Sequence, residues 1–287
     1  MPHMDNLLII GHTSLDDLHL GNHRESTIGG AGLYTALAAW RAGAAITLFA
    51  PKPEPLPEPL QAVAARVNWI GPRISPEELT RLEIVQHGGG RATLLNAHWG
   101  AEAKFTPEHL PPDLSSFALV HIAALSSAQR QLEFLHAARA RGAQRISVGT
   151  YARVVYGETA TVRQLIQEAD VFFMNENEAR GILDEAEAAH TEKLLYVTLG
   201  ERGAWVIEAA RRTHLPALMT NEVDATGAGD TFCGATLARL AAGASPVEAA
   251  HAGIALAAQT ISAPGPQALL RSKQQVDADN ADFYPRS

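Results

Sequence analysis

The residue types best suited to chemistry gather in the segment VDATGAGDTFCGA, at positions 223–235. Gly227, Ala228 and Gly229 precede an apolar run with helical spacing, and the carboxylate of Asp230 falls in the first turn of that predicted helix. A helix N-terminus exposes unpaired N–H groups and a partial positive charge, and glycines let an anion such as phosphate approach them. Beside such an anion site, Asp230 is placed to accept a proton from a hydroxyl group. In a bare G-x-G-D turn, Asp230 would instead only favour the helix dipole.

The longer pattern D-x-T-G-A-G-D, followed by Phe and small residues, resembles the C-terminal signature of the ribokinase-like (PfkB) carbohydrate kinases. In that family the final Asp is the catalytic base and the Gly-Ala-Gly backbone is the anion hole. The resemblance therefore implies catalytic roles for Asp230, Gly227, Ala228 and Gly229. The segment GHTSLDDL, at 11–18, is similar to the end of the family's first strand, where an Asp binds substrate hydroxyls, and Asp16 occupies that position.

Two further segments imply contacts with the substrate. GGAGLYTALAAWRAGA, at 29–44, resembles the family's helix that opens with a glycine pair, so Gly29 and Gly30 are expected beside the substrate. SVGTYAR, at 147–153, stands where many members have D-x-N-x-R, and it keeps Arg153. The chain departs from the family pattern at Ser14 and Tyr34, where Asn is usual, and at Gly149, where an acid is usual. All of these departures fall on the substrate side, so the resemblance supports the chemistry better than it names the substrate.

The expected nucleotide side resembles the family more closely. NENEA, at 175–179, matches the N-x-x-E motif, which implies a place near the ATP phosphates for the Asn and a magnesium contact through water for Glu178. TLGERGA, at 198–204, resembles the T-x-G-x-x-G nucleotide stretch, and residues 249–265 resemble the helix and loop that flank adenine. The ATP-binding residues implied are Asn175, Thr198, Gly200, Gly203, Thr226 and His251. For His251, an exposed position on a helix surface is an equal alternative.

Alternating strand and helix patterns along the chain predict an α/β fold with a mainly parallel sheet. Buried-type strands are expected at 6–11, 45–50, 68–72, 118–125, 145–149 and 170–175, with helices at 29–43, 127–141, 159–169 and 229–242. The Pro-rich stretch 52–60 is expected to be a loop that leads into a helix containing residues 60–67, and Glu178 falls in the first turn of a further expected helix. The runs 194–200 and 204–209 predict antiparallel neighbours, and Ser245 to Glu248 form a capping box that opens another helix. We expect one ribokinase-like domain over residues 1–287: a three-layer sandwich with a reduced β lid from segments near 17–28 and 83–99.

Composition excludes several classes of function. The formal charge of −8 disfavours non-specific binding to nucleic acid or to anionic membranes. The single cysteine, Cys233, rules out an internal disulfide framework, and its apolar surroundings predict a buried thiol rather than a nucleophile. The 12 histidines show no zinc-ligand spacing, no apolar run has the length of a membrane span, and the first residues lack a signal-peptide pattern. We therefore expect a cytoplasmic protein that binds neither nucleic acid nor membranes.

The patterns together predict an ATP- and magnesium-dependent kinase. Its acceptor is expected to be a small hydroxylated molecule: a sugar, a nucleoside or a cyclic polyol such as an inositol. A non-catalytic nucleotide or metabolite sensor on the same fold is the alternative. A Rossmann dehydrogenase is disfavoured because no G-x-G-x-x-G follows the first strand. The sequence leaves open a monovalent cation as a further cofactor and a homodimer as the assembly.

Overall fold

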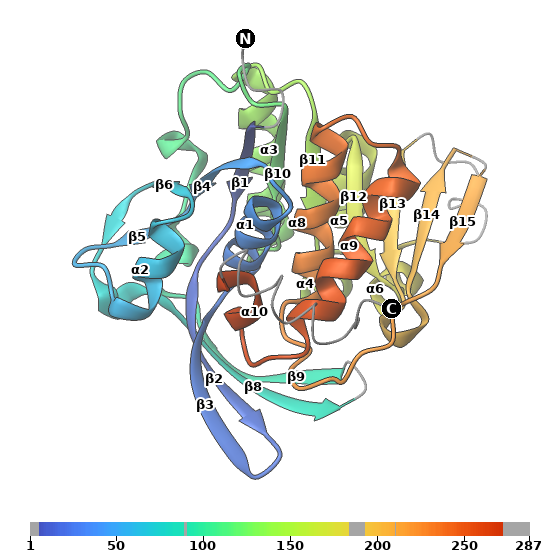
Figure 1. Cartoon of the computed structure of the whole chain (residues 1–287). Coiled ribbons are helices and arrows are strands. Elements are labelled where there is room, and N and C mark those ends of the chain that lie inside the picture. Colours follow the sequence, from blue (N-terminus) through green and yellow to red (C-terminus); the bar gives the residue numbers. More distant parts are fainter. Residues whose placement is uncertain (1–5, 89–90, 184–192, 210, 272–287) are drawn as a thin grey trace.

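The computed structural model describes residues 6–88, 91–183, 193–209 and 211–271. Within these residues, a nine-stranded sheet has the order β15-β14-β13-β12-β11-β10-β1-β4-β6 (Figure 1). Its strands are β1 (Asn6–Ile10), β4 (Ala45–Phe49), β6 (Asn68–Ile70), β10 (Leu119–Ile122), β11 (Ile146–Gly149), β12 (Val171–Asn175), β13 (Leu194–Thr198), β14 (Ala204–Glu208) and β15 (Arg211–Leu215). Neighbours from β13 to β6 pair in parallel, whereas β14 pairs antiparallel with both β13 and β15. The predicted mainly parallel sheet and its antiparallel edge are confirmed.

Strand β1 shows why this sheet needs cover on both faces. Leu7 and Ile9 belong to one core cluster, whereas Leu8 and Ile10 belong to the other, and all four side chains are fully buried. Successive side chains of a strand point to opposite faces, so a continuous apolar run requires helices above and below the sheet. The run of apolar residues at the start of the chain therefore determines a central position for β1.

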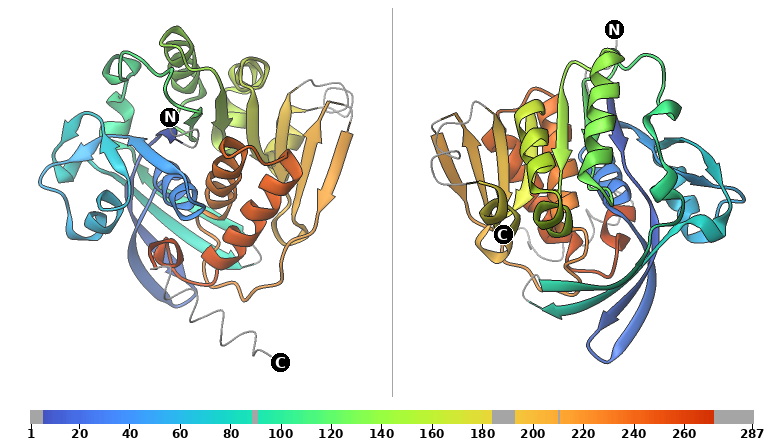
Figure 2. Two further views of the ribbon diagram at one scale, coloured as in Figure 1. Left: turned by 45° about the horizontal axis from the view of Figure 1, so that its top comes forward. Right: turned by 180° about the vertical axis from the view of Figure 1, so that it is seen from behind.

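Helices supply the two outer layers of the sandwich. Those of one face are α1 (Ala31–Arg41), α8 (Ala228–Ala241) and α9 (Pro246–Thr260), and those of the other are α3 (Ala128–Ala140) and α5 (Thr159–Glu168). The first group lies in front of the sheet in Figure 1, and the second group comes to the front when the molecule is seen from behind (Figure 2). The expected three-layer arrangement is confirmed, as is the capping box of α9, in which Ser245 and Glu248 each bond the other's backbone N–H.

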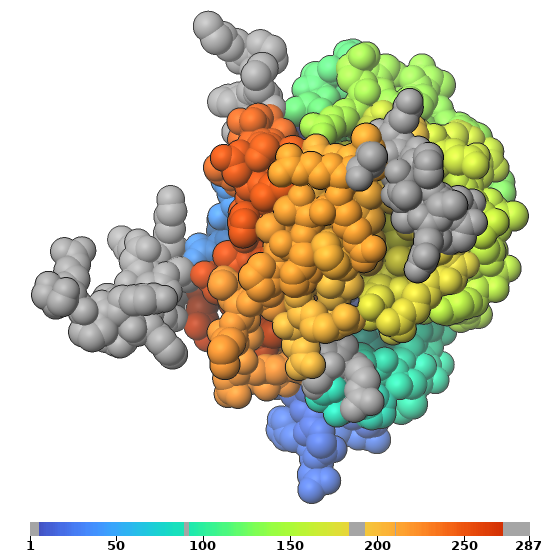
Figure 3. All heavy atoms as spheres, turned by 90° about the vertical axis from the view of Figure 1, so that its right-hand side faces the viewer, coloured from blue at the N-terminus to red at the C-terminus, as the bar shows by residue number. Residues whose placement is uncertain are grey.

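A second, four-stranded sheet crosses one end of the sandwich in the order β3-β2-β8-β9. Its strands are β2 (Ser14–Leu20), β3 (His23–Gly29), β8 (Thr80–Gly88) and β9 (Arg91–His98). Strand β2 begins only a few residues after β1, so this sheet lies at the carboxyl end of the parallel strands (Figure 1). In the space-filling view, the hairpin of β2 and β3 projects from the body and the teal strands β8 and β9 lie beside it (Figure 3). The β segments expected near 17–28 and 83–99 are present, and we refer to this sheet as the lid sheet.

Several short elements lie outside the sequence prediction. Apart from α2 (Glu58–Ala64) and α6 (Glu176–Ile182), which match expected helices, these elements are β5 (Lys52–Pro53), β7 (Arg73–Ile74), α4 (Ala152–Gly157) and α10 (Gln267–Leu270). The first of these falls in the Pro-rich stretch expected to be a loop, where two residues pair in parallel with β7. Elements this short carry little periodicity and depend on their neighbours. None of the helices in the described part of the chain has the length and apolar character needed to cross a membrane.

The start of α8 is positioned by close packing of this helix on α1, and a substitution at the contact tests that packing. A Cβ added at Gly234 would clash with the carbonyl oxygen of Thr35 and lie 2.9 Å from the Cβ of Ala38. Because backbone cannot yield as a side chain can, Gly234→Ala is expected to lower the free energy of unfolding by about 1–3 kcal/mol. Gly157→Ala is the matched control, since its Cβ would meet no atom within 4 Å. Urea unfolding of both variants checks this, and equal stability of the two would contradict the close helix contact.

Candidate active site

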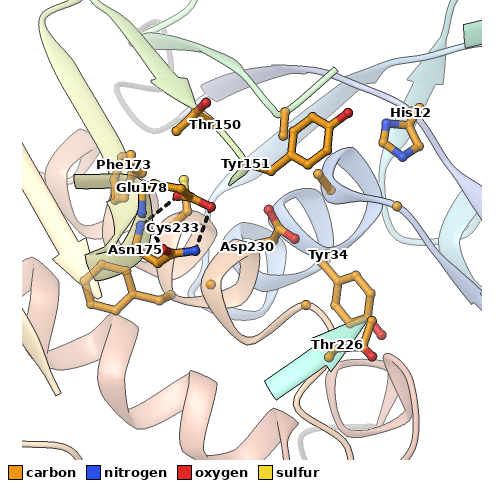
Figure 4. A pocket seen from close by; sticks show the side chains of 18 of the residues that line it. His12, Tyr34, Thr150, Tyr151, Phe173, Asn175, Glu178, Thr226, Asp230 and Cys233 are labelled. Atoms are coloured by element: carbon orange, nitrogen blue, oxygen red, sulfur yellow. Dashed lines mark hydrogen bonds between the residues drawn. The ribbon is translucent and has the colours of Figure 1, made fainter. Parts of the chain in front are cut away.

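A cavity of about 440 Å³ lies between the lid sheet, the carboxyl ends of the parallel strands and the first turn of α8. Asp16 of β2, Asn175 at the end of β12, Glu178 of α6 and Asp230 of α8 all line it. Figure 4 shows the close-up, with Asp230 between the Asn175–Glu178 pair and Tyr34. Residues separated by more than 200 positions in the sequence thus meet where the parallel strands end, as expected for ligand sites of α/β sheets.

The first turn of α8 opens onto this cavity. Its N-cap is Gly227, with φ of 73°, a left-handed conformation that favours glycine, and a Cβ there would clash with the ring of Tyr34. Gly229 also lines the cavity, but its Cβ would meet no atom within 4 Å. The protein itself therefore requires glycine at 227, whereas at 229 the lack of a side chain leaves open space at the first turn of α8. Within the turn, the Ala228 N–H donates to the Ala225 carbonyl oxygen (3.2 Å). Ala228 is the first helical residue.

Asp230 is half-buried in the wall of the cavity. Desolvation by the surrounding protein raises the pKa of its carboxyl group to about 7. A carboxylate with a pKa near neutrality is a stronger base than an exposed Asp and still loses its proton at physiological pH. The geometry and the pKa both suit the acceptance of a proton from a group bound in the cavity.

Asp16 belongs to strand β2 of the lid sheet, where it lines the cavity with 2% of its surface exposed. Burial is the largest of the effects that raise the pKa of Asp16 to about 7; the Ser14 hydroxyl lowers this pKa, and the nearby Asp17 and Asp224 charges raise it. Its carboxyl group packs directly on Gly29, where a Cβ would clash with it. Glycine is therefore needed at position 29 to leave room for the Asp16 carboxyl group, a role that differs from the expected approach of backbone to a ligand.

Asn175 and Glu178 form a capping box at the start of α6. The Asn175 backbone N–H donates to Glu178 Oε2 (2.8 Å), its Nδ2 donates to Glu178 Oε1 (2.6 Å), and the Glu178 N–H donates to Asn175 Oδ1 (2.9 Å) (Figure 4). Burial, and then the Asp230 charge, raise the pKa of Glu178 to about 7, while the Asn175 bonds lower it. The N-x-x-E motif therefore has a structural role that holds an ionisable carboxyl group toward Asp230.

Magnesium fits this arrangement only through water. In the described residues, no group of three or more His, Cys, Asp or Glu side chains could hold a metal ion. Each carboxyl oxygen of Glu178 already accepts a bond from Asn175. Mg²⁺ keeps several of its waters and is held by one or two carboxylates together with substrate phosphates, so a water-mediated contact suits these residues.

Five residues of the cavity wall carry buried polar atoms with no hydrogen-bond partner among the described residues. These atoms are His12 Nδ1, Asp16 Oδ1, Tyr34 OH, Thr150 Oγ1 and Tyr151 OH. A buried polar group without a partner is costly, so such a set marks the place where a ligand makes hydrogen bonds. Of this set, the sequence motifs single out only Asp16 and Tyr34.

Aromatic rings surround these polar atoms. Trp99 lies edge-on to His12, with ring centroids 5.9 Å apart, and 6.4 Å from the ring of Tyr151. Across the cavity, Leu82 and Ile84 of the lid sheet add apolar surface. We call the part of the cavity bounded by His12, Trp99, Tyr151 and these lid residues the aromatic chamber. No local sequence pattern predicts the aromatic chamber, because its residues come from separate loops and strands.

A buried histidine, His121, also lines the cavity, and no motif in the sequence indicates it. His121 accepts or donates a bond with Ser147 Oγ (2.8 Å), and its Nε2 lies 3.6 Å from Cys233 Sγ. Burial lowers the pKa of His121 to about 3, so the imidazole is neutral. Burial, with the Asp230 charge, also raises the pKa of Cys233 well above its usual value. Cys233 is therefore a buried thiol, as predicted.

The remaining candidates lie at or beyond the edge of the cavity. Thr198 and Thr226 line it, whereas Arg153, Gly200 and His251 are exposed and do not. Gly203 is buried, with φ of 96°, and a Cβ there would clash with the Leu215 carbonyl oxygen. Of the residues expected to bind the acceptor, Asp16 and Gly30 line the cavity together with the expected anion turn, whereas Gly29 and Arg153 do not. The expected adenine side is open surface.

Comparisons with known proteins agree with this architecture. The sequence pattern of the pfkB family carbohydrate kinases matches residues 6–273. A cytidine kinase from Thermococcus kodakarensis is 28% identical over 273 residues, which cover 90% of this chain and 96% of that protein.

Two solved structures have the same fold. A nucleoside kinase from Burkholderia thailandensis in complex with inosine has a TM-score of 0.78 and 18% identity, and covers 98% of this chain and 99% of its own. A ribokinase from Cryptococcus neoformans in complex with ADP has a TM-score of 0.77 and 19% identity, and covers 96% and 98%. Identities this low establish the ribokinase-like fold, and the family match over most of the chain goes further. The chain belongs to the pfkB family of carbohydrate kinases, phosphotransferases that act on a hydroxyl group.

Proposed function

We propose that this protein transfers the γ-phosphoryl group of ATP to a hydroxyl group of a nucleoside. The observation that carries the proposal is the meeting, in one cavity, of Asp16, Asp230 and the open first turn of α8. A buried carboxylate that can hold hydroxyl groups, a second carboxylate with a pKa near 7, and the N–H groups of a helix N-terminus are the parts that phosphoryl transfer to an alcohol needs.

The protein residues divide the chemistry between them. Asp16, an acceptor-only group when ionised, binds hydroxyl groups of the substrate and orients them. Asp230 accepts the proton of the reacting hydroxyl, a contribution of roughly 10²–10⁴ in rate. The backbone N–H groups of Gly227, Ala228 and Gly229 stabilise negative charge on the transferring group. Closure of the lid sheet over the cavity excludes water, and this exclusion suppresses transfer of the phosphoryl group to water.

The phosphate side completes this division. We assign contacts with the phosphates to Asn175, Thr198 and Thr226, which line the cavity, and contacts with adenine to the exposed Gly200 and His251. Glu178, with Asn175, would hold magnesium through water. When bound, Mg²⁺ offsets the charge of the phosphates.

A nucleoside acceptor explains the aromatic chamber. A free monosaccharide presents hydroxyls on every side, whereas a nucleoside adds a planar base with apolar faces and a polar edge. Trp99 and Tyr151 supply ring surface, Leu82 and Ile84 supply apolar cover, and the unpartnered atoms of His12 and Thr150 supply hydrogen-bonding groups for the base edge. The cytidine and nucleoside kinases among the similar proteins support the same substrate class.

The role of Asp230 gives the first prediction for activity. Asp230→Asn is expected to bind ATP and nucleoside nearly as the wild type does but to lose at least about 10²-fold in kcat, the low end for a general base. In the wild type, kcat/KM should fall as the pH drops below about 7, since the base must be ionised and its pKa is raised to that value. Steady-state rates from pH 5 to 9 check both. Near-normal turnover in the variant, or an acid limb near pH 4, would contradict the assignment.

Magnesium dependence follows from the Asn175–Glu178 pair. Activity should disappear with a chelator, and Glu178→Gln should raise the Mg²⁺ concentration for half-maximal rate by roughly 10-fold or more, as for other groups that position a metal's water ligands. Glu176→Gln is the matched control. Glu176 lies in the same motif but pairs with Arg180 and Arg202 on the outer surface. If the rates of Glu178→Gln, Glu176→Gln and the wild type depended on the Mg²⁺ concentration in the same way, the metal role of Glu178 would be contradicted.

An acceptor panel tests the reaction and the substrate class. ADP release with cytidine, inosine and adenosine should exceed that with ribose, fructose and myo-inositol by at least about tenfold in kcat/KM. Asp16→Ala should lower kcat/KM for the nucleoside by about 10–100-fold, through the lost hydroxyl contacts, with little change in the KM for ATP.

Asp17→Ala is the control for Asp16, because Asp17 is exposed on the other face of β2 and bonds Ser26. ATP and nucleoside binding without any ADP release would favour the sensor alternative. A preference for free sugars or inositol would leave the kinase proposal standing and reject the nucleoside.

A further inference from the structure

The inner face of β8 ends in a polar residue. Leu82, Ile84 and Gln86 alternate along this strand and so point to one face, and the first two line the cavity as apolar cover. Gln86 departs from that apolar pattern at the far end of the strand. Its side chain does not reach the aromatic chamber but bonds the segment that precedes α8.

Both donor hydrogens of the Gln86 amide are used in this contact. Nε2 donates to Asp224 Oδ1 at 3.0 Å and to Thr226 Oγ1 at 2.5 Å. Because Asp224 Oδ1 also accepts from the Thr226 N–H, it acts here as an acceptor, and the amide nitrogen rather than the oxygen of Gln86 faces it. The bonds join positions 138 and 140 residues apart in the sequence. They tie a lid strand to the residues that form the anion turn.

Asp224 makes the tie firm because its carboxylate also bonds the body of the protein. Oδ1 accepts from the Thr226 N–H (2.9 Å), and Oδ2 accepts from the Gly265 N–H (2.7 Å). The side chain is 1% exposed, so these charge-assisted bonds are shielded from water. Thr226 is thus held through its N–H by Asp224 and through its hydroxyl by Gln86.

Gln86 lies near one end of β8, and a second bond holds the other end of this strand. The strand starts at Thr80, whose hydroxyl bonds the Trp99 carbonyl oxygen, and Gln86 lies six residues further on, about 20 Å along an extended chain. Leu82 and Ile84 cover the cavity between these two points. The lid strand is therefore fixed at both ends, and Gln86 supplies the fixing at the end beside the anion turn.

We propose that Gln86 is a positioning residue that couples the seating of the lid sheet to the shape of the anion turn. When the lid sheet lies against the body of the protein, the Gln86 amide bonds Thr226, and this bond fixes the backbone N–H groups of residues 227–229 at the cavity. With the lid raised, this hold is lost and the turn relaxes, so the two parts of the catalytic arrangement form together. The catalytic consequence rests on the proposed kinase function, whereas the coupling itself is a property of the unliganded protein.

Two variants separate the hydrogen bond from simple space filling. With Mg-ATP and cytidine, Gln86→Ala should lower kcat by about tenfold and raise the ratio of ADP formed to cytidine phosphorylated. Gln86→Glu keeps the shape but replaces the donors with a charge facing Asp224, so its kcat should be lower still. Gln164→Ala is the matched control, since Gln164 donates to Glu168 on the outer surface of α5, and it should match the wild type. Wild-type kcat in Gln86→Glu would overturn the proposal.

Hydrogen exchange tests the coupling without any activity. In the unliganded protein, amides of residues 224–229 should exchange at least several-fold faster in Gln86→Ala and in Thr226→Val than in the wild type. The double variant should be no faster than Gln86→Ala alone, because Gln86→Ala already removes the bond that Thr226→Val removes. Unchanged exchange, or effects that simply multiply, would overturn the coupling. If no acceptor is phosphorylated, the kinase proposal fails while this measurement still decides the coupling.

Discussion

The burial of carboxyl groups around one cavity is the constraint on which the rest of this site depends. Asp16, Glu178 and Asp230 each have a pKa raised to about 7, with desolvation as the largest cause. A pKa raised in the folded state means that these groups favour folding while protonated and that this contribution is lost as the pH rises through 7. At neutral pH the protein therefore holds charges that its own groups solvate incompletely. A ligand that brings hydroxyl groups and cations relieves that cost, so the same burial that weakens the fold favours substrate.

Each carboxylate is held by a different local device, and each device explains a feature of the sequence. Gly29 leaves room for Asp16, the Asn175 capping box holds Glu178, and the start of α8 carries Asp230. None of these devices would bring the groups together alone. The parallel sheet does so, because β1 and β12 end at the same edge and α8 begins there. Local motifs thus set the orientation of each group, and the topology sets their meeting point.

This division explains what could be predicted from the sequence. The strands, the principal helices and the anion turn follow from apolar runs, capping residues and glycines, all of which are local signals. The roles of Asp16, Asp230 and Glu178 come from motifs and stay predictions, whereas the structure shows that all three residues line one cavity. The aromatic chamber could not be found in this way. His12, Trp99 and Tyr151 have no mutual spacing that indicates contact, and a buried ring looks the same in sequence whether it faces core or cavity.

Glycine shows the same limit on a finer scale. Gly227 and Gly229 are equivalent in the sequence pattern, yet the first is needed for its left-handed backbone and its approach to Tyr34, and the second leaves space in the cavity. Gly203, assigned by motif to the nucleotide, is required where β15 ends, against the Leu215 carbonyl. A motif therefore identifies where glycine is needed, but only the surrounding atoms show whether the fold or the ligand needs it.

The two halves of the site differ in their exposure, and this difference suits phosphoryl transfer. Asp16 of the lid sheet, His12 and Tyr34 are all buried, whereas Gly200 and His251 lie on open surface. An acceptor held under cover excludes the water that would compete for the phosphoryl group, while a donor on open surface can exchange freely. The anion turn lies at the boundary between the two halves. A contact from the lid to this turn, as Gln86 makes, is therefore placed where the covering of the acceptor can control the groups that stabilise the transfer.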